Sequence, residues 1–282
     1  MPPTLLKKGS ITKSKWMDNN FKRKVDNMTS IDVIIDYIEE RIWLDKNNPP
    51  LIRLRGIGSK VLVLRAYTGS GKSTLLPPYL YKKFLKLGGN LIITQPTKAT
   101  TTDIPFKILQ WNTFLKLGEN IGYQTGSIIR KPIQGILFAT YGILLQHLKV
   151  MTDEQFMNKY KFIIIDEVHK RTIEIDSCLF YLKKLLKKYW DHPKCPFIIL
   201  TSATFEPSIF MEYFKCPDDH FIDVKGLSFP IQDSFTSFDV SDYISYSFVL
   251  VEKIHVDNVD DITKGSKYRD IIIFVQGSKE IK

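Results

Sequence analysis

Short runs of β-branched and other apolar residues recur along the chain from residue 60 onward, and they constrain the fold more than any other feature. Each run is too short and too uniformly apolar to be a strand with one face in water. Such runs are typical of a parallel sheet covered on both faces, with crossover helices in the segments between them. The five runs are KVLVLRA (60–66), NLIITQP (90–96), GILFAT (135–140), KFIIID (161–166) and FIILTSA (197–203). The sequence therefore predicts an α/β fold with a mainly parallel sheet covered by helices on both faces.

The chain before this sheet has a different character. With 282 residues, 44% of them hydrophobic, the whole chain can form about one to two domains. Residues 1–28 are basic and lack apolar periodicity, so we expect either a solvated arm or an arm that touches nucleic acid. Apolar residues at helical spacing from Ile31 to Ile42 predict a packing helix behind the N-cap candidate Ser30. Residues 1–50 are thus the predicted arm and helix, and the sheet domain begins near residue 51.

Charge and cysteine content limit the classes of protein. The net charge of +10 and the isoelectric point near 9.3 favour polyanionic partners, without establishing one. The three cysteines are odd in number and form no CxxC pair, which argues against a disulfide framework or a zinc site. No apolar run is long enough to span a membrane, and the N-terminus does not resemble a signal peptide. We expect a soluble intracellular protein, in the cytoplasm or nucleus, with no membrane partner.

A glycine-rich segment, AYTGSGKST, follows the first apolar run. Small residues let backbone N–H groups turn inward around phosphates, and a lysine at this spacing reaches the β and γ phosphates. A serine hydroxyl next to the lysine is a ligand for Mg²⁺, and a helix starting here would direct its positive dipole end at the phosphates. Ala66 stands where the general pattern has its first glycine. The predicted ATP-binding residues are Ala66, Tyr67, Thr68, Gly69, Ser70, Gly71, Lys72, Ser73 and Thr74.

Two carboxylates follow the apolar run at 161–165, in the stretch FIIIDEVHKR. In open parallel sheets, ligands bind beyond the carboxyl ends of the strands. Asp166 is therefore placed to hold the water shell of a magnesium ion bound by Ser73. Glu167 is placed to orient or deprotonate a water that attacks the γ-phosphate. Without the phosphate loop, a strand ending in a solvated acidic turn would be the simpler interpretation.

Several motifs then carry a specific resemblance. The stretch DEVHKRTIEID resembles motif II of the DEAH group of superfamily 2 helicases, with Arg171 and Asp176 at matching positions. The stretches TQPTK (94–98), GYQTG (122–126), ATYGILLQHL (139–148), SAT (202–204), KGLSFPI (225–231) and IIIFVQGSKEI (271–281) resemble further parts of that group in the same order. The departures are Lys170, Thr97 and Tyr141, which concern the substrate more than the ATP site.

The resemblance implies a RecA-like P-loop NTPase domain over residues 51–232, with a linker and the incomplete start of a second RecA-like domain over 233–282. It implies an ATP-dependent helicase that uses ATP or another NTP with Mg²⁺ and binds nucleic acid, with single-stranded RNA favoured. The implied catalytic residues are Glu167, Asp166, Lys72 and His169. Ser202 and Thr204 would couple the state of the γ-phosphate to the nucleic-acid contacts. The candidate strand contacts, suited to phosphate and sugar, are Thr97, Lys98, Gln124, Thr125, Gly126 and Thr140.

Two alternatives remain open. The family's motifs V and VI, with an arginine finger that contributes roughly 10³ to 10⁵ in rate, do not occur in the sequence. The chain could therefore be a truncated nucleotide- and nucleic-acid-binding module without unwinding activity. It could instead be part of a helicase whose missing half is supplied in cis by a longer gene product or in trans by a partner chain. A transporter ATPase or small-molecule kinase is disfavoured, because no LSGGQ-like signature occurs and the resemblances to motifs Ia, III and IV would then be coincidences. The Lys-rich, Ile-rich composition suggests an AT-rich genome and a viral origin, which would place the protein in a host cell.

The segment YLKKLLKKYW (181–190) is amphipathic at helical spacing. Its apolar face carries Leu182, Leu185, Leu186 and Tyr189, and its lysines lie on the opposite face. We expect a helix that covers the sheet with a solvated outer face, in preference to a helix that binds a membrane or RNA.

Overall fold

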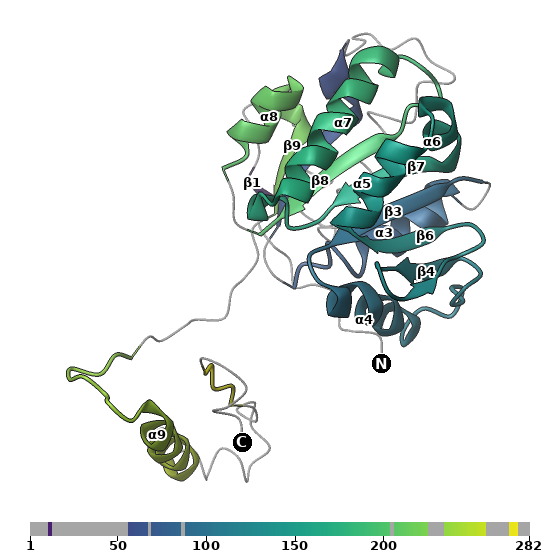
Figure 1. Cartoon of the computed structure of the whole chain (residues 1–282). Helices are drawn as coiled ribbons and strands as arrows, with labels where there is room; N and C mark the ends of the chain where they lie inside the picture. Colours follow the sequence, from purple (N-terminus) through teal and green to yellow (C-terminus); the bar gives the residue numbers. More distant parts are fainter. Residues whose placement is uncertain are drawn as a thin grey trace. The chain divides into compact units, whose positions relative to one another are not determined.

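The computed structural model describes residues 11–12, 56–66, 69–85, 88–203, 206–224, 234–257 and 271–275. The chain divides into two compact units, Met1–Ser228 and Phe229–Lys282 (Figure 1). The helix predicted behind Ser30 lies outside the described residues.

The first unit is built on a sheet whose described strands follow the order β1-β9-β2-β8-β7-β3-β6-β4-β5. All neighbouring pairs from β9 to β4 are parallel, and only the outer pairs β1–β9 and β4–β5 are antiparallel. The bounds are β1 Ile11–Thr12, β2 Val61–Ala66, β3 Asn90–Gln95, β4 Ile121–Gln124, β5 Ile129–Arg130, β6 Ile136–Thr140, β7 Tyr160–Ile165, β8 Phe197–Ser202 and β9 Phe221–Val224. The predicted mainly parallel sheet is confirmed, and each of the five apolar runs is one of its strands.

Helices cover both faces of this sheet, as predicted (Figure 1). The helical segments of the first unit are η2 Ile57–Lys60, α3 Leu76–Leu80, the π-helix η3 Tyr81–Leu85, α4 Lys98–Leu109, α5 Tyr141–Val150, α6 Asp153–Lys159, η4 Val168–Lys170, α7 Ile173–Tyr189, α8 Ser208–Phe214 and η5 Asp218–His220. One core cluster joins α3, η3 and α4 to the sheet, and the other joins α5 to α8 to the opposite face. Because successive strand residues point to opposite faces, Phe162 and Ile164 belong to the first cluster, and Ile163 and Ile165 to the second.

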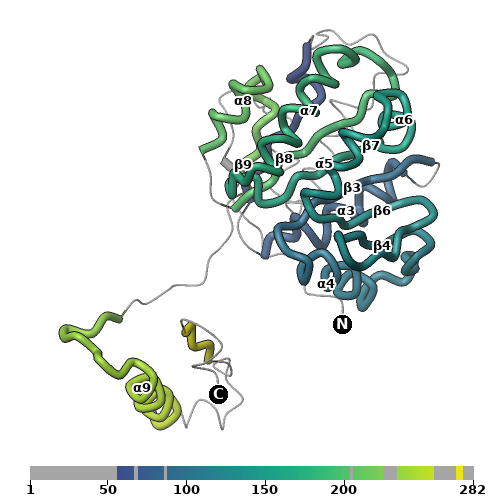
Figure 2. The backbone as a smooth tube through the Cα atoms, in the orientation of Figure 1, coloured from purple at the N-terminus to yellow at the C-terminus, as the bar shows by residue number. Residues whose placement is uncertain are grey.

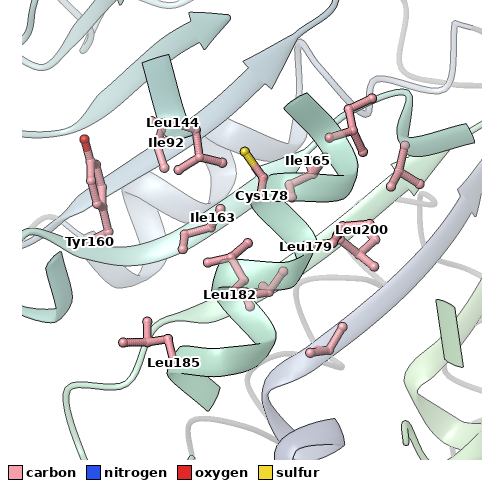
Figure 3. Packing of buried hydrophobic residues seen from close by; sticks show 14 of the residues in the cluster. Ile92, Leu144, Tyr160, Ile163, Ile165, Cys178, Leu179, Leu182, Leu185 and Leu200 are labelled. Atoms are coloured by element: carbon pink, nitrogen blue, oxygen red, sulfur yellow. The ribbon is translucent and has the colours of Figure 1, made fainter. Parts of the chain in front are cut away.

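The long helix α7 has the amphipathic arrangement that its sequence predicts. Leu182 and Leu185 are buried in the second cluster (Figure 3), and Leu186 belongs to the same cluster. The helix α7 runs beside α5 (Figure 2). On the outer face, Lys188 donates to the Asp153 carboxylate at 2.9 Å, and the Lys183 ammonium lies 3.6 Å from the centroid of the Tyr213 ring. This helix therefore covers the sheet with a charged face outward.

The second unit contains the helix α9, Tyr243–Asp257. Several large apolar side chains of α9 are exposed, among them Phe248, at 65% of its surface, and Val256, at 72%. None of the described helices is both long enough and apolar enough to cross a membrane.

The packing of α7 yields a stability test. Leu182 is fully buried, so Leu182→Ala should lower the free energy of unfolding by about 2–5 kcal/mol through lost burial and a residual cavity. Lys184→Ala, on the exposed face of the same helix, should change it by less than about 0.5 kcal/mol. Urea denaturation measures both variants. Similar losses for the two would contradict the assigned orientation of the helix.

Candidate nucleotide-binding site

The glycine-rich segment forms a tight loop between β2 and α3. Gly69 and Gly71 have φ angles of 84° and 91°, in the left-handed region that favours glycine. A Cβ atom at Gly71 would lie 2.7 Å from the Leu75 side chain, so the loop has no room for one there. Tyr67 and Thr68 of the predicted site lie outside the described residues. The backbone at both glycines therefore suits a tight turn, and the binding of phosphate by this loop stays a prediction.

Lys72 points back across this loop. Its side chain is buried and its Nζ atom donates to the Ala66 carbonyl oxygen at 2.6 Å. Burial lowers the pKa of Lys72, and the neighbouring Asp166 and Glu167 carboxylates partly offset that effect. A buried ammonium is stabilised by anionic neighbours, and a nucleotide phosphate is such a group.

The helix after the loop begins later than we expected. The backbone N–H groups of Leu75 and Leu76 both donate to the Gly71 carbonyl, but the regular helix α3 begins at Leu76 and has five residues. Pro77 and Pro78 explain the delay, because they lack the N–H groups that would bond to the carbonyls one turn earlier. α3 runs directly into the π-helix η3, so helical backbone follows the loop from Leu76 to Leu85. The contribution of this helix dipole to phosphate binding stays a prediction.

The carboxylate of Asp166 is the centre of the site. It follows β7, it is 1% exposed, and each of its oxygens accepts two hydrogen bonds. Oδ2 accepts from the Ser73 hydroxyl at 2.5 Å and from the Gln95 amide at 2.9 Å. Oδ1 accepts from the Thr201 hydroxyl at 2.7 Å and from the Glu167 backbone N–H at 3.0 Å. Ser73 and Asp166, predicted as a pair, are in direct contact.

The strand register explains how these donors meet. Ile165 at the end of β7 is aligned with Leu200 of β8 and with Thr94 of β3. The next residue of each strand lies at the same carboxyl edge of the sheet, so Asp166 falls between Thr201 and Gln95. The phosphate loop approaches from β2, which pairs with the far side of β8.

Ser73 and Asp166 supply donors that suit magnesium. Both offer hard oxygen atoms, and Mg²⁺ is usually bound by one or two carboxylates together with waters and substrate phosphates. The residues that the structure describes contain no group of three or more His, Cys, Asp or Glu side chains able to enclose a metal ion. This donor set fits an ion held jointly with a nucleotide, and not an ion held by the protein alone.

Glu167 adopts a backbone conformation that is uncommon for a residue with a Cβ atom. Its φ and ψ angles are 53° and 41°, and it leads into the short helix η4. Its Oε2 atom lies 3.2 Å from Nδ1 of His169, and that same nitrogen lies 2.6 Å from the Ser202 hydroxyl. The geometry thus connects three predicted site residues, Glu167, His169 and Ser202. Thr204 lies outside the described residues.

The candidate nucleic-acid contacts lie at or just after the ends of β3, β4 and β6, on the other half of the same sheet edge. Thr97 caps α4 by accepting from the Thr100 backbone N–H, and Lys98 is exposed beside it. Thr140 is the half-buried N-cap residue of α5. Their binding role stays a prediction.

The β4–β5 turn has buried and open parts. Gln124 and Thr125 are 6% and 1% exposed, and the Thr125 hydroxyl accepts from the backbone N–H groups of Ser127 and Ile128. Thr125 therefore shapes the turn, and a Cβ atom at the exposed Gly126 would meet nothing within 4 Å.

Sequence reasoning did not assign three side chains that contact Asp166. Gln95 and Thr201 donate to its carboxylate, and the Tyr141 hydroxyl donates to its backbone carbonyl at 2.6 Å. Gln95 and Thr201 are polar residues at the ends of apolar strands, and Asp166 directly follows such a strand. That shared position was a usable signal, but the strand order was needed to show that they are neighbours.

The chain has a RecA-like α/β sheet, with a glycine-rich loop after β2 and the buried acid Asp166 after β7. These features are those of a RecA-like P-loop domain. The DEAD/DEAH box helicase family model matches residues 52–211, and the chain belongs to that family.

Curated relatives agree with this membership. B962L, a candidate RNA helicase of African swine fever virus, is 31% identical over 99% of this chain. The ATP-dependent RNA helicase HrpA of Borreliella burgdorferi is 34% identical over 79% of this chain, and human ATP-dependent RNA helicase DHX33 is 29% identical over 82%. The chain spans 29%, 25% and 31% of the lengths of these three proteins.

The contact between Thr201 and Asp166 can be tested by an isosteric change. Thr201→Val removes a donor from a buried carboxylate and should lower the free energy of unfolding by about 1.5–3 kcal/mol. Thr94→Val is the matched control, because the Thr94 hydroxyl makes only a 3.4 Å contact with the Ile164 carbonyl and its loss should matter less. Equal losses in urea denaturation would contradict a stabilising role for the Thr201 hydroxyl.

Proposed function

We propose that this chain is the nucleotide-binding part of an ATP-dependent RNA helicase, in which ATP binding and hydrolysis are coupled to the binding of a single RNA strand. The observation that carries the proposal is the contact between the Ser73 hydroxyl and the Asp166 carboxylate, 2.5 Å apart at the carboxyl edge of a RecA-like sheet. The names of the relatives HrpA and DHX33 support RNA as the strand. Because RNA is the proposed substrate, we also propose an intracellular location.

The phosphate loop would bind the triphosphate. Lys72 would exchange its Ala66 carbonyl partner for the β and γ phosphate oxygens, a stronger charge-assisted interaction. The Ser70 hydroxyl is 1% exposed and has no hydrogen-bond partner among the described residues, so a phosphate oxygen is a suitable acceptor for it.

Ser73 and Asp166 would hold the magnesium ion, Ser73 through its hydroxyl and Asp166 through its carboxylate. The ion, when bound, would neutralise charge on the phosphates. The Asp166 carboxylate would stay fixed when the ion binds, because Gln95, Thr201 and the Glu167 backbone N–H donate hydrogen bonds to it.

Glu167 would act on the attacking water. Its backbone is left-handed, and Nδ1 of His169 lies 3.2 Å from its carboxylate. From this position the carboxylate would orient the water and accept its proton. His169 also reaches Ser202, so a change at the γ-phosphate would be passed to the end of β8. Thr204 would take part in the same coupling.

The strand would lie along the carboxyl ends of β3, β6 and β4. These strands are neighbours in the sheet, and β3 is also the neighbour of β7, which carries Asp166. Thr97, Lys98 and Thr140, with the turn formed by Gln124, Thr125 and Gly126, would contact phosphate and sugar groups. Such contacts carry no base identity, so binding would be largely independent of sequence.

A second candidate function is nucleotide-dependent RNA binding without unwinding. The relatives are much longer, since the chain spans 25% to 31% of HrpA and DHX33. Unwinding would then require a second complete helicase domain, supplied by the same polypeptide or by a partner chain.

Two substitutions separate binding from hydrolysis. Lys72→Ala should weaken nucleotide binding by about 1.5–3 kcal/mol, a factor of roughly 10 to 150, because a charge-assisted contact with phosphate is lost. Glu167→Gln should leave binding nearly intact and stop hydrolysis. Titration with a fluorescent ATP analogue measures binding, and Lys82→Ala, on the exposed side of η3, is the control. Wild-type affinity in Lys72→Ala would contradict the assignment of the loop.

Strand binding should depend steeply on salt. Each phosphate contact made by a basic side chain contributes about −0.7 to the slope of log affinity against log salt for a single strand. Lys98→Gln should reduce the slope by about that amount, whereas Lys184→Gln on the outer face of α7 should not. Fluorescence anisotropy with labelled single-stranded RNA measures the slopes. An affinity independent of salt would contradict phosphate recognition at this edge.

A further inference from the structure

The peptide unit between Asp166 and Glu167 is held at both of its polar ends. Its carbonyl oxygen accepts a hydrogen bond from the Tyr141 hydroxyl at 2.6 Å. Its N–H group donates to Oδ1 of Asp166 at 3.0 Å. This unit joins the carboxylate proposed to hold magnesium to the one proposed to direct the attacking water. Its orientation therefore fixes where the Glu167 side chain begins.

Holding this peptide unit matters because Glu167 is in the left-handed region. Residues with a Cβ atom adopt this conformation when surrounding contacts determine it. The Tyr141 hydroxyl is the only side-chain donor to the Asp166 carbonyl that the described part of the chain provides. Without it, rotation of the peptide unit would move the Glu167 carboxylate relative to Asp166.

Tyr141 is itself firmly placed. It is the first residue of α5, its side chain is 6% exposed, and it packs in the core cluster between the sheet and α7. The Cys178 thiol on α7 lies 3.7 Å from the Tyr141 carbonyl oxygen and donates to it. Burial, with the nearby Asp166 and Glu167 carboxylates, raises the pKa of Tyr141, so its hydroxyl remains a neutral donor.

The residue before Tyr141 connects this contact to the proposed strand site. Thr140 is the N-cap residue of α5 and one of the candidate RNA contacts, and its side chain makes no capping hydrogen bond within the helix. An RNA strand that hydrogen-bonds to the Thr140 hydroxyl or to the first N–H groups of α5 contacts the same helical turn that carries Tyr141. The proposed RNA contact at Thr140 is therefore separated from the Asp166 carbonyl only by one peptide step to Tyr141 and by the Tyr141 side chain.

We propose that Tyr141 is a positioning residue that ties the orientation of the Asp166–Glu167 peptide unit to the first turn of α5, and so links strand binding to the nucleotide site. The inference rests on the proposed function, because it requires both ligands to bind. The competing explanation is that Tyr141 only satisfies a buried carbonyl, in which case its loss would affect stability and nothing else.

Tyr141→Phe removes the hydroxyl and leaves the ring in the core. Tyr160→Phe is the matched control, because Tyr160 is also buried in the same cluster but its hydroxyl lies 2.8 Å from Nδ1 of His147 and does not contact Asp166. For each protein, anisotropy gives the affinity for labelled single-stranded RNA with and without saturating Mg²⁺ and a non-hydrolysable ATP analogue. The ratio of the two affinities is the coupling factor, which requires no hydrolysis.

For the wild type we expect a coupling factor of roughly 5 or more, in either direction. Tyr141→Phe should bring it at least about threefold closer to 1, while RNA and nucleotide affinities measured separately stay within about twofold. Tyr160→Phe should keep the wild-type factor. Three results would each overturn the proposal. The coupling factor of Tyr141→Phe could equal that of the wild type, the two variants could lose coupling to the same extent, or the wild type itself could have a coupling factor of 1. Absence of binding of either ligand by the wild type would instead overturn the proposed function.

A second measurement uses the wild type alone and covers the case in which Tyr141→Phe does not fold. RNA binding in the presence of the nucleotide analogue and Mg²⁺ should change the hydrogen exchange of peptides that contain the Glu167 amide. Peptides covering Tyr160–Ile165 inside β7 should not change. An unchanged exchange rate at Glu167 would contradict the link through Tyr141.

Discussion

Four hydrogen bonds to the buried Asp166 carboxylate are the interactions on which the rest of the site depends. A carboxylate removed from water is strongly unfavourable unless donors surround it. Here the donors come from the phosphate loop, from β3, from β8 and from the adjoining peptide unit. The buried carboxylate is stable only where these elements converge at the carboxyl end of β7. The order of the strands in the sheet brings the donors together, and the carboxylate in turn stabilises that order.

The carboxyl edge of the sheet divides into two halves. The phosphate loop and the ends of β7 and β8 form the half suited to a nucleotide, and the ends of β3, β6 and β4 form the half that we propose for an RNA strand. Asp166 joins the two halves directly, because Gln95 at the end of β3 donates to its carboxylate and Tyr141 on α5 donates to its carbonyl. We propose that events in one half reach the other through these two side chains.

Much of this arrangement could be predicted from the sequence, for identifiable reasons. Uniform apolar runs identify strands buried on both faces, and a glycine-rich loop or an acid after such a run is visible without knowledge of the fold. The short strands β1, β4, β5 and β9 were not predicted. Gly122 interrupts the apolar pattern of β4 and Asp223 that of β9. β1 and β5 have two residues each, and β1 pairs with β9 from within residues 1–28, which we expected to be an arm. The late start of α3 follows from two prolines whose effect depends on where the loop ends.

The roles of Gln95, Thr201 and Tyr141 could not be predicted, because they depend on which strands are neighbours. Each is an ordinary polar residue in its own segment. Only the order β8-β7-β3, together with the packing of α5, brings all three to Asp166. Sequence patterns therefore located the charged groups of the site, whereas long-range topology determined the groups that hold them.

The most direct test of the account is the dependence of nucleotide affinity on Mg²⁺ in the wild type and in Asp166→Asn. We predict that Mg²⁺ tightens nucleotide binding at least about tenfold in the wild type, and that Asp166→Asn loses this gain while still binding nucleotide through Lys72 and the loop. An equal Mg²⁺ effect in both proteins would show that Asp166 does not hold the metal ion.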